Sequence, residues 1–94
     1  MAVKLELTKA AEADLVKIYL FGLERYGLQQ ADAYAANLRQ RLANICAFPL
    51  SYPEDPDLKP ILRVSVLLGH IILYRYEETH ITVLRIRHHS EDWR

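Results

Sequence analysis

The last third of the chain, from Leu62 to Trp93, limits the possible folds more than any other segment. Its apolar and β-branched residues predict three consecutive strands over 62–67, 71–76 and 80–88, separated by short turns at 68–69 and 77–79. Turns of this length join antiparallel neighbours. The segment therefore predicts a three-stranded antiparallel meander, whose apolar face requires a covering layer.

The first half of the chain supplies that layer. Residues 3–7 alternate between apolar and polar, which is typical of a half-buried strand, and Thr8 is a suitable N-cap for a following helix. Apolar residues at spacings of three and four predict one helix that ends near Tyr26 and a second over 29–47, with Gly27 as the stop between them. A connection this short makes the two helices antiparallel neighbours.

Residues 48–60 contain all four prolines, which exclude a helix interior or a central strand there. We expect this segment to be an ordered loop that crosses the domain. The sequence thus predicts a single α+β domain over 1–94, with the element order βααβββ. In this fold a four-stranded sheet, with the antiparallel meander at its C-terminal end, packs against a helical hairpin.

Pairing the three strands sorts their side chains onto two faces. We expect Leu67 to face His70 and Tyr76 to face Ile81, because a slip of one residue would exchange the faces of a strand. The expected core face, packed on the helices, carries Leu62, Val64, Val66, Ile71, Leu73, Leu84 and Ile86, with Arg75 and Thr82 toward one end. The expected outer face carries Arg63, Ser65, Ile72, Tyr74, Tyr76, Ile81, Val83, Arg85 and Arg87, with Arg63 opposite Tyr74 and Ile72 opposite Arg85.

The expected outer face is a candidate binding surface, because it would expose an apolar patch rimmed by arginines. Arginine and tyrosine are favoured at protein interfaces, since each combines apolar area with directional hydrogen bonds. An amphipathic partner segment with acidic residues among its apolar anchors would suit such a surface. The alternative is that the loop or the C-terminal tail covers it. The candidate contacts are Arg63, Ile72, Tyr74, Ile81, Val83, Arg85 and Arg87.

Composition narrows the function classes. Twelve Lys and Arg residues balance twelve Asp and Glu residues, whereas proteins that bind nucleic acid directly usually carry a marked basic excess. Cys46 is the single cysteine, which excludes an internal disulfide and a cysteine-rich metal site. No signal-like segment opens the chain and no apolar run approaches membrane-spanning length. We therefore expect a cytoplasmic protein with no membrane partner.

We expect neither a metal nor a cofactor. His88 and His89 are neighbours on a strand, so their side chains point to opposite faces and cannot chelate one ion together. His70 and His80 lie at different turns, and no histidine and carboxylate cluster has ligand spacing.

The order of strand, helical hairpin, proline-bearing loop and meander resembles the RelE/ParE toxin superfamily of type II toxin–antitoxin systems, over essentially the whole chain. The resemblance to the ParE branch is more specific. It rests on Ala11-x-x-Asp14-Leu15-x-x-Ile18, Tyr26-Gly27, Pro49, Leu62-Arg63, His70-Ile71-Ile72-x-Tyr74-Arg75 and Leu84-Arg85-Ile86-x-His88-x-x-x-Asp92-Trp93.

This resemblance implies a function. Toxins of the ParE branch inhibit DNA gyrase by protein–protein contact, are not enzymes, and are neutralised by a ParD-like antitoxin in a hetero-oligomer. The resemblance makes the expected outer face the antitoxin-binding surface. It makes the end of the chain part of the gyrase-directed surface, with His88, His89, Asp92 and Trp93 as candidate contacts.

Two alternatives stay open. RelE-like relatives cleave mRNA on the ribosome, and Arg63, Tyr74, Arg85 and His88 could form a set of acid, base and phosphate-stabilising groups. Against this, all four lysines precede the meander, and the chain lacks the excess positive charge of a ribosome-engaging factor. The second alternative is a degenerate domain that binds its antitoxin without being toxic.

Overall fold

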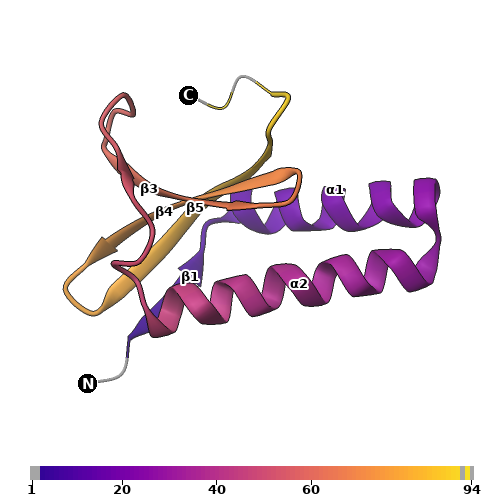
Figure 1. The fold of residues 1–94 in the computed structure, drawn as a ribbon, viewed down its shortest axis with the longest axis horizontal. Helices are drawn as coiled ribbons and strands as arrows, with labels where there is room; N and C mark the ends of the chain where they lie inside the picture. Colours follow the sequence, from indigo (N-terminus) through magenta and orange to yellow (C-terminus); the bar gives the residue numbers. More distant parts are fainter. Residues whose placement is uncertain (1–2, 92, 94) are drawn as a thin grey trace.

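The computed structural model describes residues 3–91 and 93, which form a five-stranded sheet with two helices on one of its faces (Figure 1). The elements are β1 (Lys4–Leu7), α1 (Lys9–Tyr26), α2 (Leu28–Ala47), β2 (Glu54–Asp55), β3 (Leu62–Leu67), β4 (His70–Glu77) and β5 (His80–His88). The strand order is β1-β5-β4-β3-β2, with β1 parallel to β5 and the other neighbours antiparallel. The α+β class and the meander are confirmed. The proline-bearing loop adds the short strand β2, so the sheet has five strands instead of the expected four.

Gly27 alone connects the two helices. Its φ of +91° lies in a region that residues with a side chain rarely adopt, which is why a glycine stands there. The Gly27 amide donates to the Leu23 carbonyl at 3.1 Å, and the Gly27 carbonyl accepts from the Ala31 amide at 3.0 Å. One residue thus ends α1 and begins α2, and the hairpin extends well past the sheet (Figure 1).

Thr8 caps α1, as predicted, and also joins it to the sheet. Its Oγ1 accepts a hydrogen bond from the Ala11 amide at 3.1 Å and donates one to the Leu84 carbonyl at 2.7 Å. Its backbone amide donates to the Val83 carbonyl at 3.0 Å. The pairing of β1 with β5 therefore continues directly into the first turn of the helix.

The strand register agrees with the prediction up to a β-bulge. Leu67 faces His70, Tyr76 faces Ile81 and Arg63 faces Tyr74. The predicted pairing of Ile72 with Arg85 is wrong. Tyr74 pairs with Val83 while Leu73 pairs with Arg85, so Leu84 is an extra residue on β5 and Ile72 faces Ile86. A bulge of this kind shifts every later residue of its strand by one position.

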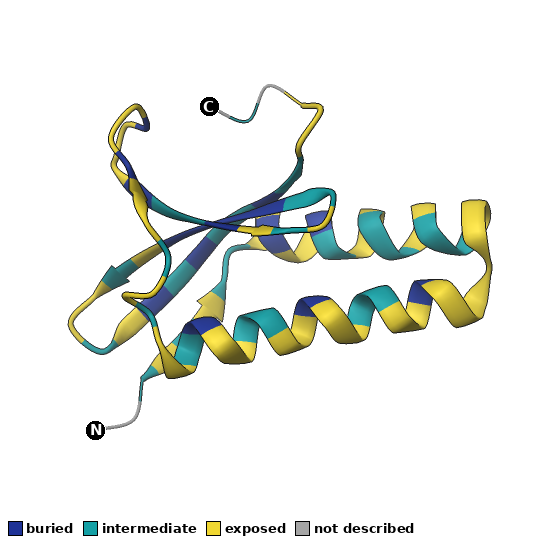
Figure 2. Ribbon diagram, viewed as in Figure 1, coloured by how far each residue is buried: buried dark blue, intermediate teal, exposed yellow. Residues whose placement is uncertain are grey.

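The predicted assignment of the two sheet faces is wrong. Ile72, Tyr74, Ile81 and Val83 are each 0% exposed, and together with Ile86 they pack against Ala11, Leu38 and Ile45 of the helices. Most of the face predicted to meet the helices lies on the other side of the sheet, and Ile86 is the exception, because the bulge at Leu84 returns it to the helix-facing side. The other side forms a second cluster of Leu62, Val64, Ile71, Leu73 and Leu84 with Leu58 of the loop and Trp93 of the tail. Figure 2 shows the buried residues concentrated in the central strands.

The reason for this error is that both faces of the meander are apolar and both are covered. The helices cover one face, and the loop and tail contribute to the cover of the other. Val66, which was expected in the core, is 60% exposed near the β3–β4 turn. An apolar pattern alone does not tell which of two such faces meets the helices.

Asp14 holds α1 against the part of β5 that β1 does not reach. Its carboxylate accepts hydrogen bonds from Arg85 Nε at 2.8 Å, Arg85 Nη2 at 3.0 Å and the Ile86 amide at 2.9 Å. Burial of Asp14 by itself would raise its pKa, but the Arg85 side chain and the Ile86 amide outweigh burial and hold the pKa below the ordinary 3.8. The Asp14 side chain thus supplies the acceptor for the Ile86 amide that a neighbouring strand would otherwise supply.

We predict that Asp14→Ala lowers the free energy of unfolding by about 2 kcal/mol, because it leaves the buried Ile86 amide without an acceptor. Urea denaturation measures this loss. Glu24→Ala changes an exposed carboxylate of the same helix and should shift stability by less than about 0.5 kcal/mol. An Asp14→Ala protein as stable as the Glu24→Ala protein would contradict this account.

The contact between Asp14 and Arg85 also predicts how the stability of the fold changes at acidic pH. Because the pKa of Asp14 is lower in the folded than in the unfolded chain, its stabilisation is complete above the ordinary pKa of 3.8 and is lost as pH falls through the folded value. Urea midpoints measured across this range should fall less steeply for Asp14→Ala than for the unsubstituted chain.

Candidate functional site

The structure removes four residues from the predicted binding surface. Ile72, Tyr74, Ile81 and Val83 lie under the helices, so they present no exposed patch on this chain. The Tyr74 hydroxyl donates to the Pro49 carbonyl at 2.6 Å, and burial raises its pKa to about 12. These side chains hold the sheet, the helices and the loop together.

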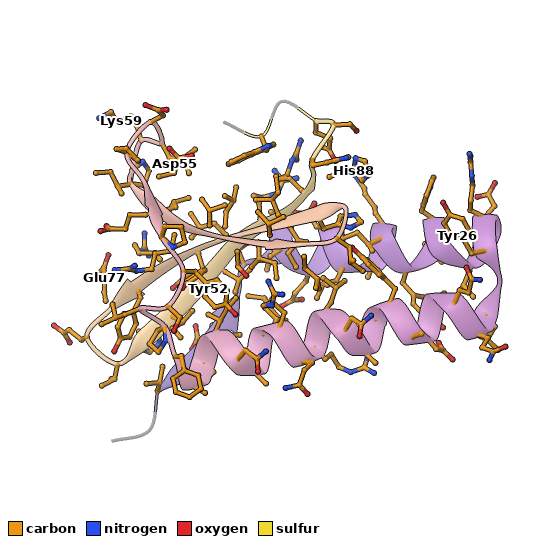
Figure 3. All side chains as sticks on the ribbon, viewed as in Figure 1. Tyr26, Tyr52, Asp55, Lys59, Glu77 and His88 are labelled. Carbon is orange, nitrogen blue, oxygen red and sulfur yellow. The ribbon has the colours of Figure 1, made fainter. Side chains whose placement is uncertain are left out.

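The three arginines of that surface each hold a different element. Arg63 Nη1 donates to the Tyr52 carbonyl at 2.8 Å and fastens the loop, from which Tyr52 projects (Figure 3). Arg85 is bound to Asp14, and this contact raises the pKa of its guanidinium. Arg87 forms an ion pair with Glu91 of the tail. Arg85 and Arg87 remain partly exposed, with 40% and 25% of their side-chain surfaces open.

The candidate ribonuclease set does not assemble into one site. Arg63 and Tyr74 face each other across the β3–β4 ladder on the helix-facing side, where Tyr74 is fully buried. Arg85 and His88 instead line a small cavity between α1 and the end of β5. A buried tyrosine with a pKa of about 12 is poorly suited to act as a base near neutral pH.

The helical hairpin exposes a group of large apolar side chains. Between residues 15 and 23, α1 is apolar on nearly all sides, whereas a helix of this kind is normally buried. Leu15 and Ile18 face the core, but Val16, Leu20 and Phe21 are 57%, 57% and 58% exposed. Exposure of this extent on adjacent turns marks an interaction surface.

A groove, which we call the hairpin groove, runs along this surface. α1 contributes Val16, Leu20 and Phe21, and α2 contributes Ala31, Tyr34 and Leu38. Gly22 faces Ala31 across the hairpin, and a Cβ at Gly22 would lie 3.5 Å from the Ala31 Cβ, which is an ordinary van der Waals distance. Tyr26 lies near the tip of the hairpin and His88 lies at the sheet end, and both line the groove (Figure 3). Apolar residues at spacings of three and four predicted one apolar face of α1, but the nearly continuous apolar run over 15–23 also indicated a second.

Aromatic and imidazole rings gather at the sheet end of the hairpin groove. The Tyr34 hydroxyl lies 2.5 Å from His70 Nδ1, and the His70 and His88 rings meet edge to face with centroids 5.2 Å apart. Burial lowers the pKa of His70 below its ordinary 6.5, and the nearby His88 lowers it further. The Tyr34 hydroxyl also donates to the Leu67 carbonyl at 3.3 Å, so these two contacts tie α2 to the end of β3 and the start of β4.

The C-terminal tail lies beside this ring cluster. The His89 amide donates to the Gly69 carbonyl at 2.9 Å, and His88 Nδ1 lies 2.6 Å from Ser90 Oγ. Trp93 is half-buried and packs against the second apolar cluster of the sheet. Asp92, the remaining predicted target contact, lies outside the described residues.

Within residues 3–91 and 93, no three histidine, cysteine, aspartate or glutamate side chains are grouped so that they could hold a metal ion. Over the same residues, neither helix is long and apolar enough to cross a membrane.

Sequence and structure both relate the chain to known proteins. Residues 5–93 match the family model described as the ParE toxin of the type II toxin–antitoxin system parDE. Toxin ParE1 of Caulobacter vibrioides is 29% identical over 84 residues, which cover 89% of this chain and 86% of that protein. A solved structure described as the chromosomal ParDE TA system from P. aeruginosa has a TM-score of 0.80 at 21% identity, covering 93% of this chain and 96% of that chain. This last likeness shows the fold.

We predict that His70 titrates below 6.5 in an NMR pH titration and that His88→Gln moves its pKa back toward 6.5. His80→Gln, at the opposite end of the β4–β5 ladder, should leave the pKa of His70 unchanged. A pKa depressed by folding also means that stability falls as pH drops below 6.5, so His70→Gln should flatten this part of the stability profile. Titration of His70 at or above 6.5 would refute the assignment.

Proposed function

The chain belongs to the ParE toxin family of type II toxin–antitoxin systems, and we propose that it inhibits DNA gyrase by protein–protein contact and is silenced by a ParD-like antitoxin. The observation that carries the antitoxin part is the hairpin groove, with its exposed Val16, Leu20 and Phe21. An amphipathic segment that lays its apolar face in this groove would cover side chains that otherwise stay in water. The gyrase part rests on the family.

The antitoxin-binding surface we propose differs from the one the sequence predicted. It moves from the sheet to the hairpin groove, because four of the predicted contacts are core residues. Arg85 and Arg87 stay in the proposal, since the cavity they line adjoins the groove and both side chains are partly exposed. Arg63 leaves it, because its guanidinium is occupied in holding the loop.

The tail supplies the gyrase-directed contacts in this proposal. His89 is exposed, and His88 beside it is partly exposed and lies at the sheet end of the groove. Trp93 would serve as the anchor that holds the tail against the sheet. Action by binding also agrees with the scattered positions of the candidate acid, base and phosphate-stabilising groups, which are engaged in structural contacts.

Induction of the chain alone in bacteria, followed by a DNA cleavage assay with purified gyrase, tests the proposed function. We expect growth arrest and accumulation of gyrase-cleaved DNA, both abolished by co-expression of the product of an adjacent antitoxin-like reading frame. Growth arrest with cut transcripts in a translating extract and unaffected gyrase would favour a ribonuclease. Unimpaired growth with an intact, antitoxin-binding protein would favour the degenerate domain.

We predict that Phe21→Glu weakens binding of the antitoxin at least about tenfold, because a carboxylate replaces an apolar anchor in the groove. Phe48→Glu is the matched control. Phe48 is 67% exposed and Phe21 58%, but Phe48 does not line the hairpin groove. Isothermal titration calorimetry measures both affinities, and circular dichroism checks that both variants fold. Equal affinities for the two variants would place the antitoxin elsewhere.

A further inference from the structure

A small cavity opens beside the sheet end of the hairpin groove, between α1 and the end of β5. Its volume is about 110 Å³, and its polar lining consists of Asp14, Lys17, His70, Arg85, Arg87, His88 and Glu91. A cavity needs about 10–15 Å³ of such space to hold one water molecule, so this cavity has room for a small group of several non-hydrogen atoms. A carboxylate with its methylene has this size. We call this cavity the basic pocket.

The side chains that line the basic pocket carry more positive than negative charges. Three permanent cations, Lys17, Arg85 and Arg87, face two carboxylates, Asp14 and Glu91. Asp14 is saturated by three hydrogen bonds from Arg85 and the Ile86 amide. Glu91 is engaged by Arg87 and by the His88 amide. Within the described residues, Lys17 has no carboxylate partner in an ion pair, so its ammonium is the group that an anion would neutralise.

The contacts of Glu91 indicate that the rim of the pocket suits a carboxylate. It is an exposed residue of the tail, and its carboxylate reaches back to Arg87 and to the His88 amide at 3.2 Å. The chain thus places one of its own carboxylates where cationic and amide donors converge. A carboxylate brought by another chain would meet the same donors and, in addition, Lys17.

The basic pocket is continuous with the hairpin groove. Lys17, Ile18, His70, His88 and Glu91 line both of them. A segment whose apolar side chains lie along Leu20 and Phe21 would therefore carry its next residues over the pocket. Apolar anchors followed by a carboxylate would complement the surface in shape and in charge.

We propose that the basic pocket binds a side-chain carboxylate of the antitoxin segment that occupies the hairpin groove, with Lys17 as the principal cation and Glu91 as an internal competitor. This rests on the proposed function, because the antitoxin is the occupant. The pocket would then set specificity: the groove selects an apolar helix face, and the pocket selects those segments that carry an acid at the right position.

Sodium acetate tests the carboxylate site without any partner. In NMR titrations of the isotope-labelled full chain, at ionic strength held constant with sodium chloride, acetate should shift the signals of Lys17 and His88 in a saturable manner. The signals of Lys9, an exposed lysine of the same helix outside the pocket, should not saturate. Uniform, non-saturating shifts of all the lysines would overturn the proposal.

Three variants make the acetate test independent of folding defects. Lys17→Met should abolish the saturable shift of His88, whereas Lys9→Met should retain it. Glu91→Gln removes the internal competitor and should raise the affinity for acetate at least about threefold. A Glu91→Gln chain whose affinity for acetate is unchanged or lower would contradict the proposed role of Glu91, and a gain of binding cannot result from unfolding.

The partner experiment separates this proposal from the proposed function. Failure of the unsubstituted chain to bind the product of the adjacent reading frame refutes the antitoxin assignment, whatever acetate does. If that complex forms, Lys17→Met should weaken it at least about tenfold relative to Lys9→Met, and the difference should shrink as salt is raised. Equal affinities of the two variants would overturn the pocket while leaving the proposed function intact.

Discussion

The hydrogen bonds that join Thr8 and Asp14 to β5 determine where the helical hairpin lies, and the other surfaces of the molecule depend on them. β1 pairs with β5 only as far as Val83, so the remainder of β5 would be an open strand edge. Thr8 closes this edge at Leu84, and Asp14 closes it at Ile86. The two side chains fasten the first half of α1 to the sheet and leave its second half beyond it. The hairpin groove exists because this second half has no sheet beneath it.

The register of the meander could be read from the sequence, but its orientation could not. Turn positions determine which residues face each other, and the pairs Leu67 with His70 and Tyr76 with Ile81 follow from them. The extra residue Leu84 leaves no mark in the apolar pattern, so the separation of Leu84 and Ile86 onto opposite faces of the sheet was not foreseeable. The four consecutive buried residues 71–74 are the informative sign, because a strand buried on both faces reads as a continuous apolar run. That run argued against any exposed sheet face.

The motifs that carried the family resemblance prove to be structural partners of one another. Asp14 binds Arg85, and Tyr74 binds the Pro49 carbonyl, although each pair is far apart in the sequence. Their order and spacing identify the fold because these contacts require them. For the same reason these residues are poor guides to the binding surface. The surface residues Val16, Leu20 and Phe21 belong to none of the motifs, and only the nearly all-round apolar character of α1 pointed to them.

The proposed antitoxin and gyrase surfaces meet at the tail, so binding of the antitoxin would affect the gyrase contacts directly. His88, Ser90 and Glu91 line the hairpin groove, while His88 and His89 are the proposed gyrase contacts. A segment seated in the groove would lie against the tail, and a carboxylate in the basic pocket would displace Glu91 from its donors. Neutralisation would then need no change in the core, because the antitoxin would cover the tail directly and would loosen the ion pair between Arg87 and Glu91 that holds it. The contacts of Asp14 with β5 and the helix-facing apolar cluster would stay in place when one partner is exchanged for the other.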